Sequence, residues 1–253
     1  MRKEEDIITG NLFSFYHRIA ELCGYERGEL EGCSYVWNRK GSWPGYLLGS
    51  PEPGRIAEPG RIQEIARAIR TKRVPAFWIM ENPGRELYGR LEEHGIRAVK
   101  QWDGMILNPD QFTPADPDPA ITIRSGDPAT LEKWLQIVNK EVVTGAQIGG
   151  EVLEAFASSG DFHWMVAYLG DQLVSTGMVF SEGGIGGLYM LATRSSFRGR
   201  GIGTAVFSEM TAAAIRQGNE AVVLHGTGIG KKIYLRTGFR EVNSYSVLWY
   251  LGL

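Results

Sequence analysis

The sequence contains little of what marks several common classes of protein. Its 253 residues include two cysteines and four histidines, and acidic and basic residues nearly balance at a formal charge of −2. Two cysteines cannot build a dense disulfide framework, and the histidines show no metal-ligand spacing, so neither a disulfide-stapled fold nor a zinc centre is expected. Without a basic excess, nucleic acid is not an expected partner.

Long apolar runs are also missing, since none approaches the roughly 20 residues that span a bilayer. The segment Met1–Asp6 is too charged for a secretory signal. We therefore expect a cytoplasmic protein with free thiols at Cys23 and Cys33 and no membrane partner. Composition does not determine the oligomeric state.

Glycine, by contrast, is abundant, and three glycines alternate in residues 197–204, which read Phe-Arg-Gly-Arg-Gly-Ile-Gly-Thr. The loop follows a strand-like run and precedes the helix-like run 205–217. Alternating glycines permit tight turns and close approach of a ligand, and the helix directs its unpaired N–H groups into the loop. With Arg194, Arg198 and Arg200 nearby, these features predict a site for a di- or pyrophosphate.

Two familiar phosphate loops do not fit this segment. A Walker loop requires Lys and then Ser or Thr after its last glycine, but Thr204 and Ala205 stand there. The dinucleotide fingerprint requires unevenly spaced glycines and an acidic residue at the end of a later strand. The strand-like run 222–225 carries no acidic residue.

The loop resembles the coenzyme A motif Gln/Arg-x-x-Gly-x-Gly/Ala of the GCN5-related N-acetyltransferases (GNAT), read here from Arg198 to Gly203. Its neighbours occur in the order of that family. Residues 187–193 resemble the fourth strand, and an amphipathic helix and the short strand 221–224 follow the loop. Residues 233–239, Ile-Tyr-Leu-Arg-Thr-Gly-Phe, resemble the family signature Leu-Tyr-x-Lys-x-Gly-Phe.

The resemblance implies an α/β (α+β) fold with a mixed, mostly antiparallel central sheet flanked by helices. It implies transfer of an acetyl group from acetyl-CoA to an amine of a small molecule or peptide, by direct attack in a ternary complex without a metal. The local patterns agree with this order. They predict strands at 121–124, 164–169, 172–180, 185–193 and 244–251, and helices from Asp127 to about Glu141 and over 151–158.

The resemblance also implies which residues hold the coenzyme. The backbone of the fourth strand would bind the pantetheine arm like an added strand, and the loop would bind the pyrophosphate. Thr227 stands where the family usually has Asn, and Ser195 where it usually has Pro. The implied coenzyme-binding residues are Leu191, Ala192, Thr193, Arg198, Gly199, Arg200, Gly201, Ile202, Gly203, Thr204 and Thr227.

Tyr234 stands where the family places the general acid that protonates the departing thiolate. The alternative for Tyr234 is simple packing with its hydroxyl in solvent. His225 closes a strand near the same place and is the candidate base, or else an exposed strand-end histidine. Tyr189 and Glu182 are weaker candidates, and ordered water can also take the proton from the amine.

A proline-rich stretch divides the chain. Four prolines between Asn108 and Pro119 exclude a helix or a central strand there. We expect an N-terminal domain over 1–108, a linker over 109–119 and a catalytic GNAT domain over 120–253. Residues 142–150 are expected to help select the acceptor.

The N-terminal half weakly repeats the sequence pattern of the C-terminal half. With Gly95 aligned on Gly238, apolar runs and a helix-like segment fall in the same order in both halves. Glu58 then replaces Gly201, and Leu91 replaces Tyr234. These losses predict a degenerate, non-catalytic GNAT-like copy; the alternative is an unrelated α/β cap.

Two other functions stay open on the sequence alone. A non-catalytic acyl-CoA sensor would keep the loop but would not need Tyr234. A transferase with another acyl donor or an oxygen acceptor would carry the same loop, because the loop contacts only the shared coenzyme.

Overall fold

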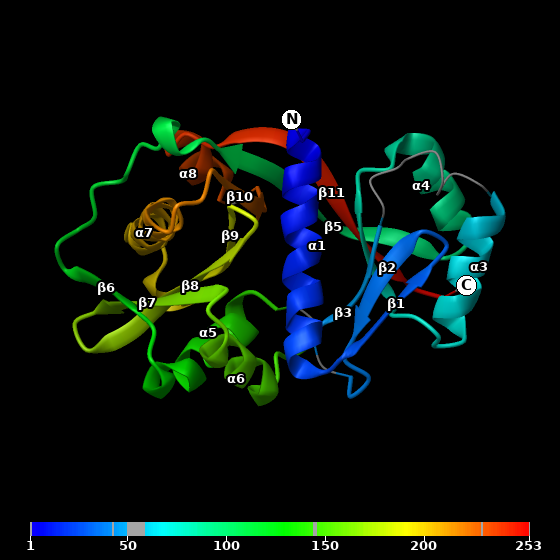
Figure 1. Ribbon diagram of the computed structural model, residues 1–253, viewed down its shortest axis with the longest axis horizontal. Helices are drawn as coiled ribbons and strands as arrows, with labels where there is room; N and C mark the ends of the chain where they lie inside the picture. Colours follow the sequence, from blue (N-terminus) through cyan, green and yellow to red (C-terminus); the bar gives the residue numbers. More distant parts are fainter. Residues whose placement is uncertain (1, 42, 50–58, 144–145, 229, 253) are drawn as a thin grey trace. The chain divides into compact units, whose positions relative to one another are not determined.

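The computed structural model describes residues 2–41, 43–49, 59–143, 146–228 and 230–252 (Figure 1). The chain forms two compact units. The first comprises Met1–Gly104 together with Val242–Leu253, and the second comprises Met105–Glu241. Residues 242–253, which the sequence division grouped with the catalytic domain, are thus part of the first unit.

A mixed, mostly antiparallel sheet forms the centre of the second unit, as the sequence predicts. Its strand order is β5-β10-β9-β8-β7-β6, and only the end of β5 belongs to this unit. The β6–β7, β7–β8 and β8–β9 pairs are antiparallel, whereas β9 and β10 are parallel. The strands are β5 (Ile96–Leu107), β6 (Ile121–Ser125), β7 (Phe162–Leu169), β8 (Gln172–Glu182), β9 (Ile185–Thr193) and β10 (Ala221–Gly226).

Glycine turns connect the hairpins of this sheet. Gly170, at φ 59°, and the pair Gly183 and Gly184, at φ 57° and 78°, take left-handed conformations that favour glycine. The predicted hairpin of 164–169 with 172–180 is confirmed, with Leu169 opposite Gln172.

The helices of the second unit also follow the sequence patterns. They are α5 (Leu131–Glu141), α6 (Gly150–Ser158), α7 (Ile202–Arg216) and α8 (Lys231–Arg236), with 3₁₀ turns η1 (Pro109–Gln111), η2 (Pro128–Thr130) and η3 (Ser195–Phe197). Asp127 is the predicted cap, but it caps η2, the turn that leads into α5. Its carboxylate accepts the Thr130 N–H at 3.0 Å, and Thr130 Oγ1 accepts the Asp127 N–H at 3.1 Å.

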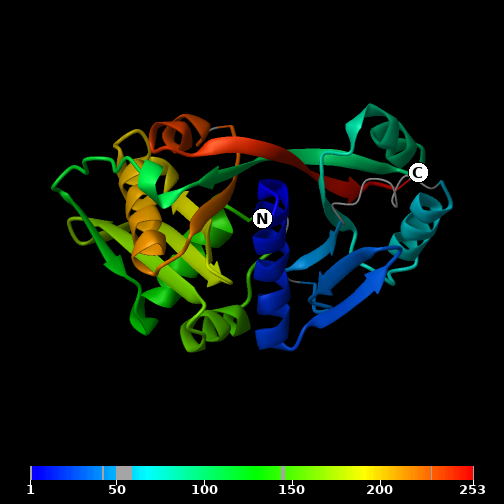
Figure 2. The same cartoon turned by 45° about the horizontal axis from the view of Figure 1, so that its top comes forward.

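The helices cover opposite faces of β7, β8 and β9 (Figures 1 and 2). Val179 and Leu188 pack in one cluster with Val206, Phe207 and Met210 of α7. The other face carries α5 and α6, whose aromatic rings extend onto the sheet: Trp134–Phe156, Phe156–Phe162 and Phe162–Phe180 have centroids 6.0, 4.8 and 5.0 Å apart. Strand alternation therefore divides the core into an aliphatic α7 face and an aromatic α5 face.

The proline-rich segment lies against the second unit. Phe112 packs against the α7-face core, the Thr113 N–H donates to the Thr237 carbonyl at 3.1 Å, and the Ala115 N–H donates to Ser208 Oγ at 2.9 Å. Apart from the 3₁₀ turn η1, the segment forms no helix or strand, as expected, and side-chain and backbone acceptors of the unit satisfy the extended chain.

The first unit has a sheet in the order β1-β2-β3-β4-β11, in which β3 and β4 are parallel and the other pairs are antiparallel. Its core includes Leu47, Ile65, Trp78 and Leu248. Its strands and helices are β1 (Glu26–Leu30), β2 (Cys33–Trp37), β3 (Gly45–Leu48), β4 (Phe77–Glu81), β11 (Arg240–Tyr250), α1 (Glu4–Cys23), α3 (Pro59–Arg70) and α4 (Gly84–Glu93). No helix in the described part of the chain is long and apolar enough to cross a membrane.

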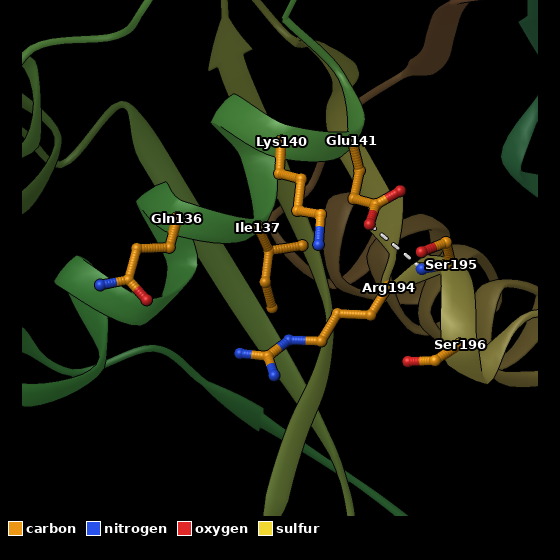
Figure 3. A pocket seen from close by; sticks show the side chains of 7 residues that line it. All are labelled: Gln136, Ile137, Lys140, Glu141, Arg194, Ser195 and Ser196. Atoms are coloured by element: carbon orange, nitrogen blue, oxygen red, sulfur yellow. Dashed lines mark hydrogen bonds between the residues drawn. The ribbon is translucent and has the colours of Figure 1, made fainter.

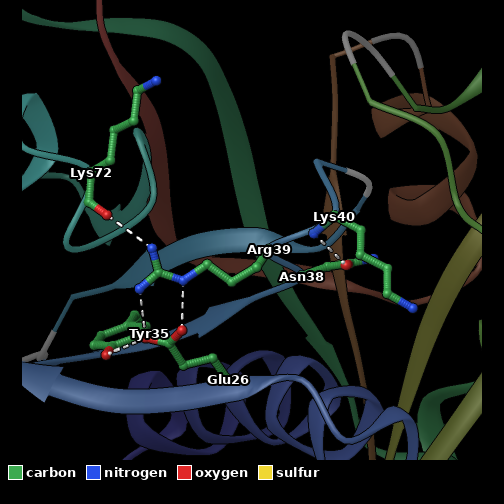
Figure 4. A network of polar contacts seen from close by, with 6 residues as sticks. All are labelled: Glu26, Tyr35, Asn38, Arg39, Lys40 and Lys72. Atoms are coloured by element: carbon green, nitrogen blue, oxygen red, sulfur yellow. Dashed lines mark hydrogen bonds and ion pairs between the residues drawn. The ribbon is translucent and has the colours of Figure 1, made fainter.

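A polar network ties the first hairpin of this unit to the turn after α3 (Figure 4). Arg39 donates to both carboxylate oxygens of Glu26, at 2.6 and 2.9 Å, and to the Lys72 carbonyl at 2.9 Å. Tyr35 donates to the same carboxylate at 3.0 Å. The planar guanidinium of arginine suits this bidentate geometry. The network therefore holds the hairpin through the directions of its hydrogen bonds as well as through charge.

The two units share an order of elements. In the first unit β2 pairs antiparallel with β3, α3 follows, β4 pairs parallel with β3, and α4 comes next. In the second unit β8, β9, α7, β10 and α8 have the same order and the same pairings. Gly95 and Gly238 both have positive φ before the strand that follows. The predicted counterpart of the loop falls mainly on residues 50–58, which lie outside the described residues. The degenerate copy therefore stays a prediction.

Candidate active site

Strands β9 and β10 separate partway along their length. Their parallel ladder pairs Ile185 with Ala221 and ends with Leu188 opposite Leu224. β9 nevertheless continues to Thr193 and β10 to Gly226. Beyond Leu188 the edge of β9 therefore has no pairing with β10 in the described ladder, and its backbone groups on that side are open to a ligand.

A bulge shapes this open edge. Thr176 pairs with Ala192 and Met178 with Tyr189, so β9 advances three residues (189 to 192) while β8 advances two (176 to 178). Met190 has φ 53°, the left-handed region that non-glycine residues rarely adopt. Thr176 Oγ1 donates to the Met190 carbonyl at 3.0 Å, and Ser175 Oγ donates to the Ala192 carbonyl at 2.6 Å. Hydroxyls of β8 thus hold the bulge from one side and leave the other side free.

The loop that follows β9 forms a cradle of backbone donors. Gly199 and Gly201 have φ 77° and 75°, and α7 begins at Ile202. Within the described chain, none of the N–H groups from Gly199 to Thr204 donates to a backbone carbonyl. A β-carbon on Gly201 would meet no atom within 4 Å, so the space above the loop is open. Free donors at a helix N-terminus are the features that bind phosphate.

Arg198 does not point freely into this cradle, because Glu141 holds it. Glu141 Oε2 accepts from Arg198 Nη2 at 2.5 Å, and its Oε1 accepts the Ser195 N–H at 3.1 Å. The Glu141 side chain is only 7 % exposed, whereas Arg198 is 58 % exposed. Arg198 Nε also donates to the Thr193 carbonyl at 3.2 Å. The sequence reasoning missed Glu141, and no local motif marks it.

Tyr234 packs across the end of β10, at the point where β10 leaves β9. Its ring lies against Phe207 of α7 at 4.7 Å between centroids. A β-carbon on Gly226 would come within 2.6 Å of the ring, and one on Gly230 within 2.3 Å of the hydroxyl. Burial raises the pKa of Tyr234, so the phenol keeps its proton at neutral pH. An alanine in place of Gly230 would therefore collide with this hydroxyl.

His225 lies on the opposite, aromatic face of the same strand end. Its ring stacks on Tyr189, with centroids 6.4 Å apart, and Tyr189 contacts Phe180 at 6.5 Å. Both ring nitrogens are buried, although the residue as a whole is half-buried. This burial lowers the pKa of His225 to about 3. The imidazole is thus neutral at physiological pH and only weakly basic.

Thr227 and two lysines of α8 follow β10 in the chain, whereas Glu182 lies away from this centre. Thr227 follows β10, and its carbonyl accepts the Gly230 N–H at 3.0 Å. Lys231 forms an ion pair with Glu241, whereas Lys232 is exposed. Glu182 lies at the far end of the β8–β9 hairpin, opposite Ile185. Of the predicted acceptor loop 142–150, residues 144 and 145 lie outside the described residues.

A pocket of about 290 Å³ opens beside the start of the loop (Figure 3). It lies between the last turns of α5 and residues 194–196, on the α5 face of the sheet. Its lining residues are Gln136, Ile137, Lys140, Glu141, Arg194, Ser195 and Ser196.

Comparison with known proteins connects this site to one family. Residues 129–247 match the model of the acetyltransferase (GNAT) domain. The match includes the bulged strand, the donor loop, His225 and Tyr234. A comparison with curated proteins finds no match.

Solved structures with the same fold include a GCN5-related N-acetyltransferase from Kribbella flavida. That structure has a TM-score of 0.71 at 14 % identity and covers 96 % of each chain. A GCN5-related N-acetyltransferase from Sphaerobacter thermophilus has a TM-score of 0.61 at 19 % identity, covering 98 % of this chain and 93 % of its own. A GCN5-related N-acetyltransferase-like protein from Streptococcus suis has a TM-score of 0.55 at 13 % identity, covering 96 % and 98 %. At these identities the likeness shows the fold alone.

Proposed function

We propose that this protein, whose residues 129–247 match the GNAT acetyltransferase domain model, transfers an acetyl group from acetyl-CoA to an amine of a small molecule or a peptide. The observation that carries the proposal is the free N–H cradle of residues 199–204, placed directly after the open, bulged edge of β9. A pyrophosphate that carries a peptide-like arm would use both features, the cradle for its phosphates and the strand edge for its arm.

The chain offers matching groups for each part of this coenzyme. The N–H groups from Gly199 to Thr204 bind the pyrophosphate, and the Glu141–Arg198 pair holds their loop in place. The backbone of Leu191, Ala192 and Thr193 binds the pantetheine arm as an added strand, with Thr227 beside it. N–H groups of the same edge polarise the thioester carbonyl.

The two faces of the strand ends support a ternary complex. Tyr234 stands on the α7 face and His225 on the α5 face. We infer that the coenzyme sulfur meets Tyr234, while the acceptor amine arrives from the aromatic side. The amine nitrogen attacks the carbonyl carbon, the C–S bond breaks, and Tyr234 donates its phenolic proton to the departing thiolate.

We assign to water the removal of the proton from the acceptor amine. His225 was the candidate base, but with a pKa lowered to about 3 it is a poor acceptor for a proton from an ammonium group. Its neutral ring instead supports Tyr189 by stacking. Water then passes the proton to solvent, and Tyr234 is reprotonated in the same way.

The first unit is proposed to be a degenerate copy that binds no coenzyme. Leu91, the counterpart of Tyr234, is buried and apolar. Tyr88, one turn earlier, is hydrogen-bonded to Ser246. We place the reaction in the cytoplasm, whose reducing conditions suit the free thiols Cys23 and Cys33.

Calorimetric titration with acetyl-CoA tests this function directly. We expect one site per chain, and we expect Gly201→Asp to abolish it, because a carboxylate would enter the phosphate cradle. Gly170→Asp is the matched control, since Gly170 is also exposed, has φ 59° and has nothing within 4 Å of a β-carbon. Unchanged affinity in Gly201→Asp would refute the loop assignment, and two sites per chain would refute the degenerate copy.

A further inference from the structure

The pocket between α5 and residues 194–196 is lined by two cations, Lys140 and Arg194, for whose side chains the described part of the chain shows no hydrogen bond or ion pair (Figure 3). Its single carboxylate, Glu141, already accepts from Arg198 and from the Ser195 N–H. The remaining charged groups are the Lys140 ammonium, which lies to the right of Ile137 in Figure 3, and the Arg194 guanidinium, which lies below it. The Gln136 amide and the Ser196 hydroxyl add neutral donors.

We propose that this pocket is a subsite for an anionic group, a carboxylate or a phosphate, on the acceptor amine. This inference rests on the proposed acetyltransferase function and adds a substrate class to it. A planar guanidinium and an ammonium that line the same pocket suit an oxyanion, which the arginine binds through paired N–H donors and the lysine as a point charge.

The location of the pocket assigns it to the acceptor. It opens on the α5 face, the face on which His225 and Tyr189 stand. Tyr234 and α7 occupy the opposite face. The cradle of residues 199–204 supplies its own donors to the coenzyme pyrophosphate, so the pocket cations are not required there.

The size of the pocket fits a group rather than a whole substrate. About 290 Å³ accommodates a carboxylate or phosphate with a few further atoms. The buried Ile137 forms an apolar floor between the two cations. The acceptor therefore extends from this subsite along the α5 face toward the end of β10.

Binding of paired amines to the protein–CoA complex tests the proposal without turnover. Amino acids are compared with their carboxamides, and aminoalkyl phosphates with the parent amino alcohols, by calorimetry. We expect at least one anionic series to bind about tenfold or more tightly than its neutral partner. In Lys140→Gln/Arg194→Gln this ratio should fall toward one. Lys133→Gln, which removes an exposed cation of α5 outside the pocket, should preserve it.

Equal binding within both pairs, or a preference that survives the double substitution, would overturn the proposal. The 3′-phosphate of the coenzyme is another anion that could occupy this pocket. Titration with CoA and with 3′-dephospho-CoA tests whether it does. If the double substitution weakens CoA but not 3′-dephospho-CoA, the pocket belongs to the coenzyme and the acceptor subsite is refuted. Failure of the proposed function is seen separately, as absence of acetyl-CoA binding by the unsubstituted protein.

Discussion

At the scale of single residues, the site depends on two side chains that burial affects in opposite ways. Burial favours the neutral form of any titratable group, so it raises the pKa of Tyr234 and lowers that of His225. The same effect makes Tyr234 a phenol that stays protonated and makes His225 an imidazole that stays uncharged. In the proposed reaction Tyr234 can therefore act as the proton donor, whereas His225 is a poor base.

Replacing Tyr234 with Phe should reduce kcat about 100-fold or more, since general acid catalysis contributes about that much. The ring would still pack on Phe207, so the affinity for acetyl-CoA should change little. Steady-state kinetics and calorimetry measure the two effects. Tyr168→Phe, a substitution of the same atoms elsewhere in the second unit, is the control. A kcat equal to that of the unsubstituted enzyme would remove Tyr234 as the acid and favour an acyl-CoA sensor or packing role.

His225 should make the protein less stable in mild acid. The unfolded imidazole takes up a proton below pH 6.5 and the folded one only near pH 3, so the unfolded state binds more protons between these values. This stability is present above pH 6.5 and is lost as the pH falls, by at most about 1.4 kcal/mol per pH unit.

Urea unfolding between pH 7 and pH 5 checks this expectation. His225→Gln should show a shallower fall of the unfolding free energy than the unsubstituted protein. The pKa values of His17 and His163 are also lowered by burial, but these residues are present in both proteins and cancel in the difference. Identical slopes would mean that His225 is solvated in the folded state.

At the scale of elements, the phosphate loop is positioned by a helix remote from it in sequence. Glu141 ends α5, while Ser195 begins η3 and Arg198 directly follows it. The nearly buried carboxylate joins both to the α5 face, so the loop cannot shift without breaking this pair. We therefore propose that Arg198 is a positioning residue and that backbone N–H groups are the phosphate ligands.

A double-mutant cycle tests this division of roles. Glu141→Gln and Arg198→Ala should each weaken acetyl-CoA binding about fivefold, and together they should cost little more than either alone, because both break one pair. The coupling expected from such a cycle is about 1 kcal/mol. Arg200→Ala is the control, since Arg200 lies over Phe197 and outside the pair, and its effect should add to that of Glu141→Gln. Additive losses for Arg198 would assign it directly to phosphate.

At the scale of the whole molecule, the last strands of the two repeating patterns are exchanged. β11 follows the second pattern in sequence but pairs with β4, where Val247 stands opposite Ile79. β5 follows the first pattern, and its end, with Met105 and Leu107, enters the core of the second unit beside β10. Each unit is thus completed by a strand from the other half of the sequence.

The exchange predicts where a core substitution will loosen the structure. Leu248→Ala, in the core of the first unit, should cost about 2–5 kcal/mol and increase hydrogen exchange in β3 and β4. Val222→Ala, in the core of the second unit, is the matched control and should act on β8 and β9. Increased exchange of β8 and β9 in Leu248→Ala would contradict the strand assignment.

The sequence by itself determined what depends on local chemistry. Glycines before an amphipathic helix specify the loop from Arg198 to Gly203, and alternation and turn residues specify the hairpin that ends at Leu169 and Gln172. The mixed, mostly antiparallel fold was predicted through the resemblance of these segments to the GNAT family. Tyr234 was identifiable because its signature lies within one short segment.

Only the tertiary structure decided what depends on partners distant in the chain. Glu141 shows no local signal, because its role comes from its contact with Arg198, which lies 57 positions later in the sequence. The low pKa of His225 comes from burial that no spacing of residues records. The sequence did not predict the exchange of β5 and β11. Alternation of apolar and polar residues shows that a strand exists and which face it buries. Which strand it pairs with depends on which sheet edge the folded chain leaves open.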